Sequence, residues 1–111
     1  MTSTYSPLLT DLYQITMAYG YWKTGADRKE SVFHLFFREN PFKGGYTIAC
    51  GLEEVMDFID AFQFSEEDLS YLKQLCGNDN GPLFEPAFID YLRNLDFSCN
   101  VDAVEEGTVV F

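Results

Sequence analysis

The sequence predicts an α+β fold, because its helical and strand-like segments are grouped along the chain and do not alternate. Apolar residues recur at helical spacing in four segments, which is typical of amphipathic helices. Other segments alternate apolar residues or cluster β-branched ones, which is typical of strands. The predicted order is one helix, two strands, three helices and two short strands, within one modest domain over residues 1–111.

The first predicted helix runs to about Lys23, with Thr10 or Asp11 as its N-cap and Gly25 just beyond its end. It carries two apolar stripes on nearly opposite sides. The first stripe is Leu12, Ile15, Tyr19 and Trp22, and the second is Tyr13, Met17 and Tyr21. Either the helix is buried between two layers of its own domain, or one stripe faces the core and the other a subunit interface or a pocket. The pattern leaves both readings open.

Residues 32–38 follow, where apolar and mixed positions alternate, and they predict a strand with one apolar face. A loop marked by Asn40-Pro41 and Gly44-Gly45 leads to a second predicted strand over residues 46–50. This short connection favours a hairpin, with the two strands paired antiparallel. The last residues, 99–111, predict two short strands around a turn at Glu106-Gly107.

Three amphipathic helices are predicted between these strand regions. The first begins near Leu52, the second follows Ser65 as a good N-cap, and the third begins near Pro86, a favoured first helical residue. Glycine at position 77 is expected to stop the second. The positions expected to face inward are Leu52, Val55, Met56, Ile59 and Phe62, then Leu69, Leu72 and Leu75, then Phe88, Leu92 and Leu95.

Composition narrows the classes of function. A net charge of −11 disfavours nucleic acid and anionic membranes as partners. Three cysteines without CxxC spacing predict neither a disulfide framework nor a zinc site, and favour reduced thiols in the cytoplasm. No signal peptide and no membrane-spanning run is expected. The aromatic content of 17% hints at more apolar surface than so small a domain can bury, and the apolar end EEGTVVF suggests a piece of a longer protein.

Few residues have a recognisable chemical setting. His34, on a predicted strand beside Phe33 and Phe37, is expected to be a packed structural histidine, and Cys50 a buried small hydrophobe. The acidic runs follow helix surfaces and predict no metal site. Arg38, where an apolar strand meets a loop, offers a guanidinium that could reach an anion. Tyr13 offers a flat platform for a planar ring, in a helix first turn that also favours an anion such as a ring carboxylate.

Four blocks of the sequence together resemble the N-terminal region of nicotinate phosphoribosyltransferases, from about Pro7 onward. These blocks are LLTDLYQITMAYGYWKTG, VFHLFFRENPFKGGYTIACGLEEVMDFI, FIDYLRNLDF and VDAVEEGTVVF. The resemblance implies a segment of the α/β-sandwich domain of a type II phosphoribosyltransferase. It also implies that the catalytic α/β barrel lies downstream and that the whole protein is a homodimer with shared active sites.

The implied reaction joins nicotinate to phosphoribosyl pyrophosphate, giving nicotinate mononucleotide and pyrophosphate in NAD salvage, with ATP hydrolysis and Mg²⁺. The tyrosine of TDLYQ, here Tyr13, would lie against nicotinate in the partner's site, and the FFR arginine, here Arg38, would approach the phosphoribosyl phosphates. The resemblance implies that the remaining ligands lie beyond residue 111, so we expect no catalytic or metal-binding residue here and an inactive fragment. The alternative is a non-catalytic dimerisation or interaction module.

Overall fold

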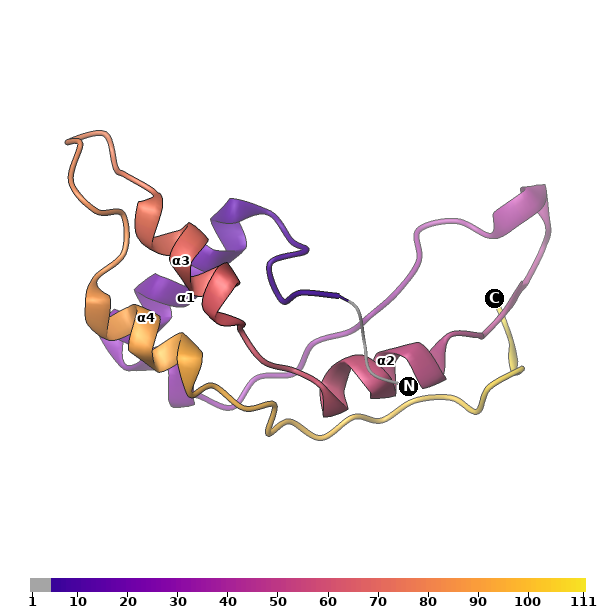
Figure 1. Ribbon diagram of the computed structural model, residues 1–111. Helices are drawn as coiled ribbons and strands as arrows, with labels where there is room; N and C mark the ends of the chain where they lie inside the picture. The colour runs from indigo at the N-terminus through magenta and orange to yellow at the C-terminus, as the bar shows by residue number, and fades with distance from the viewer. Residues whose placement is uncertain (1–4) are drawn as a thin grey trace.

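The computed structural model describes residues 5–111. Residues 1–4, which open the stretch where no signal peptide is expected, lie outside the described residues. The order of elements is α1 (Leu12–Thr24), η1 (Ala26–Arg28), η2 (Pro41–Lys43), β1 (Thr47–Ile48), α2 (Leu52–Asp60), α3 (Glu66–Gln74), α4 (Pro86–Arg93) and β2 (Val109–Val110). The helices α1, α3 and α4 gather at one end of an elongated molecule, and β1, β2 and η2 lie at the other (Figure 1). The mixed α+β character is therefore confirmed.

The ends of α1 follow from its capping residues. The Asp11 backbone N–H donates to Oε1 of Gln14 at 3.0 Å, which is half of a capping box. Gly25 adopts φ 78°, a left-handed conformation that glycine accepts without strain. Its N–H donates to the Trp22 carbonyl at 3.3 Å and closes the last turn. The predicted boundaries of this helix are confirmed.

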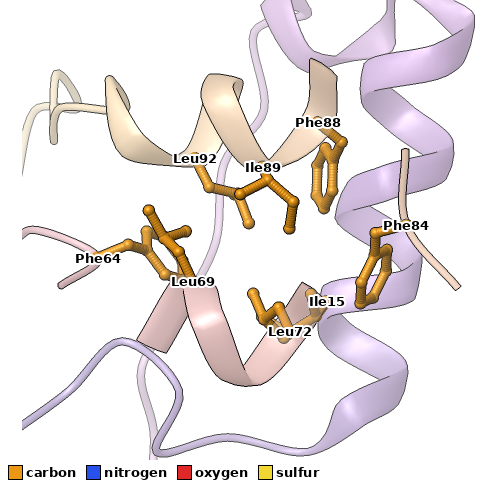
Figure 2. Packing of buried hydrophobic residues seen from close by; sticks show 8 residues of the cluster. All are labelled: Ile15, Phe64, Leu69, Leu72, Phe84, Phe88, Ile89 and Leu92. Carbon is orange, nitrogen blue, oxygen red and sulfur yellow. The ribbon is translucent and has the colours of Figure 1, made fainter. Parts of the chain in front are cut away.

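The core is a single apolar cluster between α1, α3 and α4 (Figure 2). Its buried members are Ile15, Phe64, Leu69, Leu72, Phe84, Phe88, Ile89 and Leu92. Phe88 is central, because its ring centroid lies 5.0 Å from that of Tyr19, 5.6 Å from Trp22 and 5.4 Å from Phe84. The predicted inward faces of α3 and α4 are thus confirmed at their buried leucines and at Phe88, whereas α2 contributes no buried residue.

The helices α3 and α4 are joined by charged groups as well as by the core. Ser65 caps α3, where its Oγ accepts from the Asp68 N–H at 3.0 Å. Arg93 of α4 donates to Glu66 of α3 through Nε at 2.7 Å and Nη2 at 3.3 Å, and also bonds to Asp90. The hydrogen bond from Arg93 lowers the pKa of the Glu66 carboxyl below its ordinary value of 4.5.

Arg93→Gln should make folding stability less sensitive to acid. A carboxyl whose pKa is lower in the folded state stabilises the fold above its unfolded pKa, and that stability is lost as pH falls through the folded pKa. We therefore expect a lower urea midpoint for the variant at neutral pH, and a difference from wild type that disappears well below pH 4.5. Urea titrations across this range measure it, with Arg28→Gln as control because that side chain is 88% exposed. An equal loss at every pH would contradict the assignment.

The predicted hairpin is wrong. Residues 32–38 form no strand, and β1 pairs instead with β2, antiparallel, with Thr47 opposite Val110 and Ile48 opposite Val109. Before β1, Phe42 and Lys43 adopt φ 59° and 55°, so the chain turns through η2 without laying residues 32–38 beside β1. An alternating pattern becomes a strand only where a neighbour satisfies its backbone groups. The first of the two predicted short C-terminal strands is also absent, although the turn at Glu106-Gly107 is confirmed.

Much apolar surface stays uncovered in the segment between η1 and β1. Phe33 is 89% exposed and Leu35 91% exposed, and Phe42 is fully exposed. The chain exposes 9252 Å², whereas a folded monomer of 12.7 kDa should expose about 6,200 Å². Its radius of gyration is 17.2 Å, against about 13 Å for a compact domain of this length. The chain is therefore less compact than a folded monomer of its mass, and its exposed aromatic and aliphatic side chains agree with the expectation of more apolar surface than so small a domain can bury.

Glu106, in the turn before β2, links the β1–β2 end of the molecule to α2. One carboxylate oxygen, Oε2, accepts from the backbone N–H of Gly51 at 3.2 Å and of Leu52 at 3.1 Å. These donors belong to the start of a helix, where N–H groups lack intrahelical partners and a negative charge is favourable.

Glu106→Ala should weaken α2 by about 1 kcal/mol, the usual loss when a side-chain cap is removed. Amide hydrogen exchange at the first residues of α2 measures this. We expect the substitution to speed exchange at these residues relative to wild type, and to leave exchange in α4 unchanged. Glu105→Ala is the matched control, since Glu105 carries the same charge but its side chain does not cap α2. Equal effects of the two substitutions would show that charge, not capping, matters.

Candidate functional site

Tyr13 lies in the first turn of α1 and points away from the helical core. It is 60% exposed, and Met17 and Tyr21, which share its stripe, are 47% and 49% exposed. In the other stripe, Ile15 is buried, and Tyr19 and Trp22 pack partly against the core. Within the part of the chain described, the helix is therefore not buried between two layers. One apolar stripe remains uncovered, and Tyr13 is its first residue.

Tyr13 lies at the N-terminus of α1, next to the capping residue Asp11. The first N–H groups of a helix have no partner inside it, and the helix dipole places partial positive charge there. Thr16 fixes the same turn, where its Oγ1 donates to the Tyr13 carbonyl at 2.8 Å. An exposed phenol ring at this place can stack on a planar ring, while the Asp11 side chain already caps the Gln14 N–H at the same helix end. One predicted member of the opposite stripe, Leu12, is half exposed, because it precedes the first contact of α1 with the core.

Arg38 lies in an exposed bend that leads into η2. Figure 1 shows η2 at the end of the molecule opposite α1, so the structure does not bring Tyr13 and Arg38 into one site within a single chain. None of the ion pairs found among residues 5–111 involves Arg38. Its guanidinium is accessible to an anion.

Two expectations about single residues are wrong. His34 is exposed and not packed, and Cys50 is exposed and not buried. Both expectations depended on the predicted hairpin. Without a neighbouring strand, residues 32–38 bury neither face, and Cys50 lies beyond the two residues of β1 that pair with β2. In the described range, no group of three or more His, Cys, Asp or Glu side chains could hold a metal ion.

An open groove of about 620 Å³ lies between η1, the end of α4 and the chain that follows α4. It is lined by Asp27, Arg28, Phe62, Tyr91, Asn94, Leu95, Asp96, Phe97, Ser98 and Cys99. Burial, with a smaller effect of the Asp27 charge, raises the pKa of the Tyr91 hydroxyl. Neither Tyr13 nor Arg38 lines this groove. Sequence reasoning missed it because most of its lining comes from irregular segments that have no periodic pattern.

A charged contact ties α1 to the start of α4. Lys23 Nζ lies 2.7 Å from Glu85 Oε1 and 5.3 Å from the centroid of the Tyr19 ring. The hydrogen bond from Lys23 to Glu85 raises the pKa of the Lys23 amine and lowers the pKa of the Glu85 carboxyl. Because Lys23 is engaged beside the core, it is not a free cation for a ligand at Tyr13.

Comparison with known proteins gives consistent matches. The family model of the nicotinate phosphoribosyltransferase (NAPRTase) N-terminal domain matches residues 8–111. Nicotinate phosphoribosyltransferase 1 of Arabidopsis thaliana is 50% identical over 107 residues, 96% of this chain and 18% of the relative. The nicotinate phosphoribosyltransferases of Caenorhabditis elegans and Homo sapiens are 47% and 43% identical over 106 residues, 95% of this chain and 18% and 19% of the relatives. No solved structure matches.

Proposed function

Because the chain belongs to the nicotinate phosphoribosyltransferase N-terminal domain family, we propose that it is part of an enzyme that joins nicotinate to phosphoribosyl pyrophosphate. The products are nicotinate mononucleotide and pyrophosphate, in NAD salvage. The observation that carries the proposal is the match of the family model over residues 8–111. The chain spans only 18–19% of the relatives named above, so the activity is proposed for the longer protein and not for this segment alone.

In the proposed reaction the nitrogen of the nicotinate ring attacks C1 of the ribose as pyrophosphate leaves. The transition state places positive charge on the sugar, so the contribution of the protein is mainly positioning and electrostatics. Tyr13 would hold the ring in line by stacking, and it would do so in the site of a second subunit, since its stripe is exposed in its own chain. Arg38 would approach the phosphates of the phosphoribosyl group.

ATP and Mg²⁺ belong to this proposal for the whole enzyme. The described residues offer no cluster that would hold a metal ion, so no step is assigned to either group in this segment. We also propose that the β1–β2 pair contributes to an α/β-sandwich domain, because each strand of this two-stranded sheet has an unpaired edge at which further strands can pair. The three cysteines without paired spacing support a cytoplasmic location. Among the described helices, none has the length and apolarity needed to cross a bilayer.

The test is an activity assay on the longest protein that contains this segment. Purified protein is given nicotinate, phosphoribosyl pyrophosphate, ATP and Mg²⁺, and nicotinate mononucleotide and pyrophosphate are quantified. We expect both products with nicotinate, and much less product with nicotinamide. The 111-residue chain is the control, and we expect it to be inactive and to show no nicotinate binding by isothermal titration. A longer protein without nicotinate-dependent product would refute the proposal.

A second candidate is a non-catalytic interaction module. The observation that favours it is the exposed area of 9252 Å², about 3,000 Å² above that of a compact monomer of this mass. The coding sequence separates the two candidates. A reading frame that continues into a long α/β region supports the enzyme, whereas a stop codon directly after Phe111 supports the module.

A further inference from the structure

The loop between α3 and α4 contains the only asparagine followed by glycine in the sequence, Asn80-Gly81. Asn80 is exposed and adopts φ 63°, in the left-handed region that asparagine tolerates better than most residues. Glycine has no Cβ, so the side-chain amide of Asn80 can approach the Gly81 nitrogen without a steric barrier. Every other asparagine of the chain precedes a larger residue, and Asn40 precedes Pro41, which has no N–H.

Hydrogen bonds hold this loop closed. The Gly77 N–H donates to the Gly81 carbonyl at 2.8 Å, and the Asn80 N–H donates to the Gly77 carbonyl at 3.0 Å. The Gly81 N–H donates to Oδ1 of Asp79 at 3.0 Å. This hydrogen bond therefore engages the N–H of the nitrogen that would act as the nucleophile. Its negative charge also opposes loss of the Gly81 proton, because a nearby like charge disfavours an anionic form.

We propose that Asn80 is a site of spontaneous deamidation and that Asp79 restrains its rate. The Gly81 backbone nitrogen loses its proton to a base in solution and attacks Cγ of Asn80. A new N–Cγ bond closes a five-membered imide, the Cγ–Nδ2 bond breaks, and the amide leaves as ammonia after it takes a proton from water. A second water molecule adds to one of the two imide carbonyls and opens the ring to aspartate or isoaspartate. No oxidant or reductant is needed.

The product changes the connection between two core helices. Both products add a negative charge beside Asp79, and isoaspartate also inserts a methylene group into the main chain. The loop is closed at its base by the Leu83 N–H, which donates to the Leu75 carbonyl at 2.9 Å. A longer main chain between these residues shifts the register of Gly77 and Gly81. The modified loop should therefore open more often than the unmodified one.

Ageing of the full chain in mildly alkaline buffer tests the proposal. Peptide mapping by mass spectrometry follows each asparagine, and enzymatic methylation detects isoaspartate. We expect conversion at Asn80 to be several-fold faster than at Asn78 in the same loop, and faster than at Asn94 and Asn100. Gly81→Ala should slow it several-fold. If Asn80 converted no faster than Asn78, the assignment of Asn80 as the deamidation site would be overturned.

Asp79→Ala tests the restraint, with Asn94 and Asn100 as internal references because the residue after Asn78 changes. We expect conversion at Asn80 to be several-fold faster than in the wild-type chain. Asp79→Ser removes the charge but keeps a short acceptor, and should give an intermediate rate. Hydrogen exchange at the Leu83 amide checks that the loop remains closed in each variant. An unchanged or slower rate in a closed Asp79→Ala loop would overturn the role of Asp79.

Discussion

Phe88→Ala should lower the free energy of unfolding by about 3–5 kcal/mol, the usual range for a buried phenylalanine. Phe88 has no exposed surface, and its ring contacts aromatic side chains from α1, from α4 and from the segment before α4. The removed ring leaves a cavity where these elements meet. A domain of this size holds only about 5–15 kcal/mol in total, so the variant should lose most of its cooperative transition.

Urea denaturation followed by Trp22 fluorescence measures this effect, because the Trp22 ring lies 5.6 Å from Phe88. Phe36→Ala is the matched control. It removes the same side chain from a position that is 72% exposed, where surface substitutions usually change stability by less than about 0.5 kcal/mol. If both variants unfolded at the same urea concentration as wild type, the helical cluster would not be the stabilising core.

Tyr13→Ala in the longer enzyme should raise the KM for nicotinate about two- to tenfold, because ring stacking contributes about 0.5–1.5 kcal/mol and 1.4 kcal/mol is tenfold. The fold should be unchanged, since the ring is 60% exposed and lies outside the core. Steady-state kinetics with nicotinate varied at saturating phosphoribosyl pyrophosphate measures the change.

Two variants sharpen this test. Tyr13→Phe keeps the ring and should keep a KM near that of wild type. Tyr21→Ala removes a tyrosine from the same exposed stripe two turns further along, so it reports any general effect of that surface. A KM that rises equally for Tyr13→Ala and Tyr21→Ala would assign the effect to the surface, and an unchanged KM for Tyr13→Ala would remove the proposed role.

The helices could be predicted from the sequence because their signals are local. Capping residues such as Asp11, Ser65 and Gly25 lie within a turn of the ends that they define, and apolar spacing marked the buried faces of α3 and α4. Strand pairing could not be predicted in the same way. The partner of β1 lies about sixty residues away, and the pattern of residues 32–38 does not say whether a neighbouring strand exists.

In the candidate site too, local features could be predicted from the sequence, whereas features that depend on distant parts of the chain could not. That Tyr13 would start an exposed apolar stripe was one of two alternatives left open by the pattern, and only the exposure of Tyr13, Met17 and Tyr21 in the folded chain decides between them. The environments of His34 and Cys50 depended on the absent hairpin and were therefore predicted wrongly. The roles of Tyr13 and Arg38 toward a ligand stay predictions, because they depend on a partner surface and not on local sequence.

The bond from Glu106 to the start of α2, together with the pairing of β1 with β2, has a consequence for the order of folding during synthesis. When α2 leaves the ribosome, neither its capping carboxylate nor the partner of β1 has yet been translated. The helical cluster can therefore assemble first, and the strand end can close only after the last residues of the segment have emerged.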